Sequence, residues 1–70
     1  MNSLKKFLEE NGYILHILQD NLIVASSDRF KTVRIEKNRN DMYVLKSEFV
    51  QYKSNKFTDI RLFILNKIMN

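Results

Sequence analysis

Few side chains in this sequence could do chemistry, and most kinds of active site lack a required member. His16 is the single imidazole available as a general base, and it lies in an apolar segment. The chain has no Cys and one Gly, which excludes a cysteine-ligated zinc site and a glycine-rich phosphate loop. A Ser-His-Asp arrangement around His16 would need a cleft, and 70 residues give little material for one. We therefore predict that His16 is a packed or rim histidine.

The carboxylates fall where turns and helix starts are expected, at Asp20, Asp28, Asp41 and Asp59. Asx turns and helix N-termini account for acids at such places without catalysis. One enzyme class stays open, a metal-independent ribonuclease, in which cationic and phenolic groups stabilise charge on the reacting phosphate. The side chains available for it are Arg34, Tyr43, Tyr52 and Lys53, but no spacing among them indicates a site. We predict a non-catalytic protein with no metal, cofactor or small-molecule substrate.

The positive charge of the chain raises the question of nucleic-acid binding. Twelve Lys and Arg stand against eight Asp and Glu, giving a net charge of +4. Cations next to aromatic rings suit phosphate contacts combined with base stacking. The candidate contacts are Arg29, Lys31, Tyr52, Lys53, Lys56 and Arg61. Strand alternation, however, sends Lys31 and Lys37 to one face and Arg34 to the other. The charge could instead serve only to keep a hairpin soluble and to protect an edge strand.

Length and composition limit the class of protein. With 44% hydrophobic and 11% aromatic residues, the chain is too apolar for a disordered tail, and it makes one domain, residues 1–70. The longest apolar stretch, 13–26, is interrupted by polar side chains and is too short for a membrane span. Two acids follow closely on Lys5 and Lys6, where a secretory signal would be apolar. We expect a cytoplasmic protein.

Helical patterns are predicted at both ends of the chain. Near the N-terminus, apolar residues recur at helical spacing, Ser3 can cap the start, and Gly12 can end the helix. A second helix is expected to begin after 54–56, or after Thr58 as its cap, and to run to about Met69. Its apolar stripe is unusually wide for a surface helix.

Between these helices the sequence predicts a four-stranded antiparallel meander, and therefore an α+β fold. The expected strands are 13–18, 22–26, 31–37 and 42–47. Turn residues lie between them, and the segment 48–56 is left open between a strand end and a helical turn. The helices could pack together on one face of the sheet or cover one face each. The first arrangement would leave an apolar face in need of a partner.

Excess apolar surface is the main indication of function. Both faces of the first predicted hairpin are apolar, which is more than one small core needs. The predicted partner surface is one face of the second hairpin with its basic turn, comprising Arg34, Tyr43, Leu45, Lys37 and Arg39. We expect a protein-binding module, with a homodimer left open and nucleic-acid binding as the alternative.

The balance of residue types points to an origin. Asn, Lys and Ile, which have AT-rich codons, are abundant, whereas Ala, Gly and Pro are scarce or absent. This bias indicates an AT-rich gene, such as that of a low-GC bacterium or a phage. Small products of phage-like genes often bind or inhibit a larger host protein, so we expect a regulator or inhibitor of the phage or mobile-element type.

Overall fold

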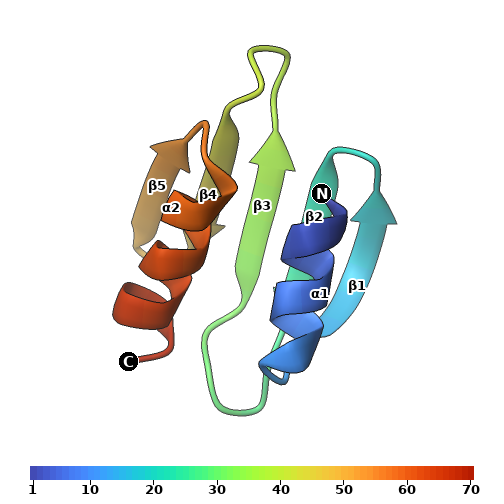
Figure 1. The fold of residues 1–70 in the computed structure, drawn as a ribbon. Helices are drawn as coiled ribbons and strands as arrows, with labels where there is room; N and C mark the ends of the chain where they lie inside the picture. The colour runs from blue at the N-terminus through green and yellow to red at the C-terminus, as the bar shows by residue number, and fades with distance from the viewer.

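In a computed structural model, the chain forms a five-stranded antiparallel sheet preceded by one helix and followed by another (Figure 1). The α+β class is confirmed, with one strand more than predicted. The structure describes residues 1–16 and 19–70. Its elements are α1 (Asn2–Glu10), β1 (Ile14–Gln19), β2 (Leu22–Ser26), β3 (Val33–Lys37), β4 (Tyr43–Ser47), β5 (Val50–Ser54), α2 (Phe57–Phe63) and the π-helical turn η1 (Ile64–Ile68).

The strands lie in the sheet in chain order, so each pairs with its neighbour in the sequence. This is the predicted meander. In the first hairpin the register shifts directly after Leu15, which pairs with Ala25. His16 is therefore the extra residue of a β-bulge, whereas a regular hairpin with a two-residue loop at 20–21 would pair His16 with Ala25.

The segment that the sequence left open supplies the fifth strand. Ser47 pairs with Val50 across a two-residue turn, whose first residue, Glu48, has a φ of 40°. A positive φ at this position is typical of a type II′ hairpin turn, which matches the twist of paired strands. The Glu48 carboxylate lies 3.0 Å from the Lys31 ammonium, and the Ser47 hydroxyl donates to the Thr32 carbonyl at 2.7 Å. The turn is thus tied to the chain that enters β3.

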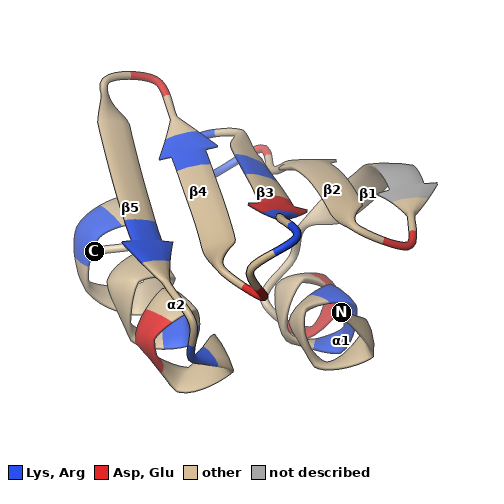
Figure 2. Ribbon diagram, turned by 90° about the horizontal axis from the view of Figure 1, so that it is seen from above, with Lys and Arg blue, Asp and Glu red and all other residues tan. Residues whose placement is uncertain are grey.

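Both helices lie on the same face of the sheet, as the view along its edge shows (Figure 2). Apolar side chains of α1, α2 and η1 meet the inward-facing residues of β2, β3 and β4 in one core. At the end of that core the Tyr52 ring stacks on the Phe63 ring, with 4.4 Å between centroids. The largest fully buried side chains are Leu4, Leu8, Ile23, Val33, Ile35, Leu45, Ile60 and Ile64. The other face of the sheet is left without a covering helix.

The helix ends differ in part from the expected ones. Helix α1 begins at Asn2, no side chain caps it, and Ser3 is an exposed residue of its first turn, so the predicted Ser3 cap is wrong. Gly12 follows α1 with a φ of 87°, as expected of a helix stop. Helix α2 starts after Lys56, the earlier of the two predicted starts. In the part of the chain that the structure describes, no helix is long and apolar enough to cross a membrane.

Candidate functional site

The second hairpin distributes the predicted partner-binding residues over two faces. Arg34 pairs with Lys46, and Ile35 pairs with Leu45. Because neighbouring side chains in a strand point to opposite faces, Leu45 and Tyr43 turn toward the helices with Ile35, while Arg34 turns away from them. Leu45 is completely buried. The predicted common face of Arg34, Tyr43 and Leu45 is therefore wrong.

The turn between β3 and β4 explains this error. The Asn38 backbone N–H donates to the Met42 carbonyl, which leaves a three-residue loop at 39–41. Asp41, its last residue, has a φ of 57°, as in three-residue hairpins that end in a left-handed residue. The sequence-based register assumed a four-residue loop, 38–41. A difference of one residue in the register exchanges the two faces of the strand.

Three of the predicted residues gather at this turn. The Lys37 ammonium lies 5.3 Å from the centre of the Tyr43 ring and 3.8 Å from the Asp41 carboxylate. Lys37 and Tyr43 are half-buried, whereas Arg39 is exposed at the tip of the loop. They form a small cationic end of the sheet, separate from the face that carries Arg34.

The uncovered side of the sheet, which we call the open face, brings together outward residues of four strands. One row of cross-strand neighbours runs Leu22, Glu36, Val44, Lys53, and the next runs Val24, Arg34, Lys46, Gln51. Residues joined in this way point to the same side of an antiparallel sheet. Both helices lie on the opposite side, so these side chains face outward (Figure 2).

The open face is basic toward β5 and apolar toward β2. Its cations are Arg34, Lys46 and Lys53, and its one acid among the residues just named is Glu36. The Arg34 guanidinium and the Glu36 carboxylate approach to 4.0 Å, and their exposure makes this a weak ion pair. Sequence reasoning missed the gathering of cations, because Lys46 was not assigned to the site. Strand alternation was the signal that could have found it. Residues two apart in a strand share a face, so Lys46 lies on the same side as Val44, and Lys53 on the same side as Gln51.

Of the six residues predicted to contact nucleic acid, Lys53 lies on the open face. Tyr52, its neighbour in β5, points to the helices and stacks on Phe63. The others are scattered: Arg29 in the β2–β3 loop, Lys31 beside the β4–β5 turn, Lys56 before α2 and Arg61 within α2. The six do not form one surface.

His16 lies at the rim of the sheet, where its imidazole forms a hydrogen bond with the Ser26 hydroxyl. Both a Ser-His nucleophile and a general base need a third group that orients the imidazole. Among the described residues, no hydrogen bond joins His16 to a carboxylate, and no group of three potential ligands could hold a metal ion.

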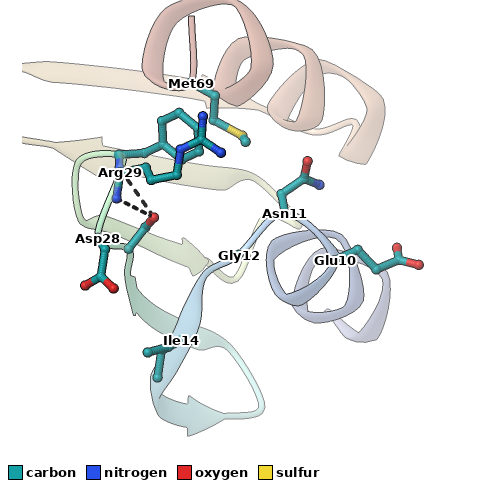
Figure 3. A pocket seen from close by; sticks show the side chains of 9 residues that line it. Glu10, Asn11, Gly12, Ile14, Asp28, Arg29 and Met69 are labelled. Atoms are coloured by element: carbon teal, nitrogen blue, oxygen red, sulfur yellow. Dashed lines mark hydrogen bonds between the residues drawn. The ribbon is translucent and has the colours of Figure 1, made fainter.

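A cleft of about 530 Å³ lies where the end of α1, the β2–β3 loop and the C-terminal residues meet (Figure 3). In its wall the Ser27 hydroxyl accepts hydrogen bonds from the backbone N–H groups of Arg29 and Phe30. The charged side chains around it, Glu10, Asp28 and Arg29, are exposed and of both signs. Because these charges are mixed, the cleft has no strong preference for a ligand of one charge. Because they are exposed, none of them is a buried polar group that could fix a ligand in place.

Tyr13 anchors the loop beside this cleft. Its hydroxyl donates to the Lys31 carbonyl at 2.9 Å, and its ring stacks on Phe30 with 6.4 Å between centroids. Burial raises the pKa of the Tyr13 phenol above its ordinary value of 10.0. The folded chain therefore holds this proton more tightly than the unfolded chain does.

This difference predicts alkaline destabilisation that depends on Tyr13. The contribution of the neutral phenol is complete below pH 10.0, and it is lost as the pH rises from there through the raised pKa of the folded state. We expect Tyr13→Phe to make the free energy of unfolding fall less steeply above that pH. Urea unfolding of both proteins at a series of alkaline pH values measures this, and equal slopes would contradict it.

The chain matches no known protein-family model, no curated protein and no solved structure. The open face is the candidate site, since it combines an uncovered sheet with side chains of predominantly one charge.

Proposed function

We propose that the protein is a non-catalytic binding module whose open face binds an acidic surface of a partner protein. The observation that carries this proposal is the one-sided packing of the helices, which leaves three cations and one carboxylate in the two described rows of the uncovered face. Charges of one sign speed the encounter with a partner of opposite charge and reject partners of like charge.

The apolar part of the open face suits the centre of a protein interface. Val24 and Val44 are half-buried on this face; Arg34 pairs with Val24 and is a diagonal neighbour of Val44, which pairs with Glu36. Protein interfaces commonly combine an apolar centre with a polar rim, and Arg is enriched among the residues that dominate binding. The partner that fits is an apolar patch bordered by Asp and Glu. A small module bound there would act as a regulator or inhibitor by occupying that patch.

A protein partner is favoured over a nucleic acid by the position of the aromatic rings. Proteins that bind single strands stack bases on aromatic side chains of the binding face. Here Tyr43 and Tyr52 turn toward the helices, and no aromatic residue belongs to either described row of the open face. A nucleic acid would meet phosphate-binding cations without a stacking platform.

Titration at two salt concentrations tests the proposal. Proteins captured from an extract of the native host by the tagged chain are purified and titrated against it, and fluorescent single-stranded DNA and RNA are titrated in parallel. We expect a purified acidic protein to bind more tightly than either nucleic acid, and to bind more weakly at higher salt because surface charges are screened. Tighter, salt-sensitive binding of DNA or RNA would favour the alternative function. Failure of every purified protein to bind would overturn the proposal.

A further inference from the structure

The two edges of the sheet differ in how well they could accept another strand. At one edge, the ladder of β1 is interrupted by the bulge at His16, and such a bulge discourages pairing with a further strand. At the other edge, β5 pairs with β4 without interruption over Val50–Ser54. The outer side of β5 is thus the regular edge.

The β4–β5 turn determines which backbone groups of β5 point outward. The residues that flank a two-residue hairpin turn, here Ser47 and Val50, exchange hydrogen bonds with each other. Hydrogen-bonded and non-hydrogen-bonded pairs then alternate along the two strands. The N–H and C=O groups of Gln51 and Lys53 therefore point away from β4, toward the open edge.

Exposed apolar side chains flank the same edge. Among the described residues, Phe49 is 97% exposed, Leu62 50% and Val50 36%. Leu62 and Tyr52 line a cleft of about 230 Å³ between α2 and β5. A nearly fully exposed phenylalanine beside the outer edge of a sheet is a surface that association would bury.

We propose that β5 pairs with β5 of a second copy of this chain, antiparallel about a two-fold axis at Tyr52. In this register Gln51 of one copy lies opposite Lys53 of the other, so their outward N–H and C=O groups bond to each other. Like charges are not placed directly opposite, and the Gln51 side-chain carbonyl can accept from the Lys53 ammonium. Phe49 of each copy comes to lie against Asn55 of the other. The two sheets become one, in the isologous contact that two-fold symmetry requires.

This pairing uses the backbone edge of β5 and not the centre of the open face, although the side chains of Gln51 and Lys53 border both, and it does not rest on the proposed function. It would join the open faces of two copies and bring their cations nearer to one another. Salt screens this repulsion, so self-association is expected to strengthen as salt is added. Binding of an acidic partner is expected to weaken as salt is added. Because self-association and partner binding respond to salt in opposite directions, the β5 pairing and the proposed function can fail independently of each other.

Sedimentation equilibrium of two matched variants tests the pairing. The wild-type chain, of 8.4 kDa, is expected to approach twice that mass at a few hundred micromolar. Gln51→Pro removes an outward N–H and leaves the β4–β5 ladder intact, since proline is tolerated at such edge positions. Gln51→Ala removes the same side chain and keeps the N–H. We expect the dimer dissociation constant to rise at least about tenfold for Gln51→Pro relative to Gln51→Ala.

A monomeric wild-type chain at these concentrations, or equal dimerisation of folded Gln51→Pro and Gln51→Ala, would overturn the pairing. If Gln51→Pro is unfolded by circular dichroism, amide hydrogen exchange of the wild-type chain decides. The amides of Gln51 and Lys53 should then exchange more slowly as the protein concentration rises. Exchange that does not depend on concentration at both amides counts against the proposal.

Discussion

Replacing Leu45 by alanine is expected to lower the free energy of unfolding by about 2–5 kcal/mol. Leu45 is completely buried, and its strand neighbours on the covered face are Ile35 and Tyr52. Truncation there removes apolar contacts and leaves a cavity that a sheet packed under two helices can fill only in part. A domain of this length has a total stability of roughly 4–10 kcal/mol, so the variant should lose a large part of it and unfold at a clearly lower urea concentration than the wild-type chain.

Val44→Ala is the matched control, since it truncates an adjacent residue of the same strand. Val44 lies on the open face, half-buried, and its loss should cost less than about 1 kcal/mol. Urea unfolding followed by circular dichroism measures both variants. The register places Leu45 on the covered face and Val44 on the open face. A larger loss of unfolding free energy for Val44→Ala than for Leu45→Ala would contradict this register.

The same hairpin marks the limit of what could be predicted from the sequence. The strands were predictable, because apolar alternation and turn residues locate them within a residue or two. Which side chains of each strand face the helices was not predictable, because this depends on whether the loop after Lys37 has three or four residues. Asn38 decides this, since its side-chain carbonyl accepts from the backbone N–H groups of Asn40 and Met42 and holds the shorter loop. Such a local contact leaves little trace in a hydrophobic pattern.

The excess of apolar surface, by contrast, was evident from the sequence. The wide stripe of the last helix divides into Ile60, Ile64 and Ile68, which are buried, and Leu62 and Leu65, which remain exposed. The buried three recur every four residues, so they form one stripe along the side that the helix turns toward the sheet. The sequence could not predict that both helices choose the same side of the sheet, because that depends on tertiary packing.

The charge on the open face leads to the second large effect. Replacing Arg34, Lys46 and Lys53 together by glutamate is expected to weaken binding of the acidic partner by at least about 100-fold. The change removes three attractive contacts and sets like charges against the acidic surface, which costs several kcal/mol. All three side chains are exposed, so the fold should persist. Titration of the purified partner with each variant at two salt concentrations measures the effect.

The control is a second triple variant, in which Lys6, Lys56 and Lys67 become glutamate. These lysines are exposed; Lys6 lies in α1, Lys56 directly before α2 and Lys67 in η1, away from the open face. Both variants change the net charge equally, so a long-range effect of total charge acts on them alike. A loss confined to the open-face variant therefore reports where the partner docks. Equal losses would mean that the partner responds to the charge of the whole molecule, and the open face would lose its assignment as the binding site.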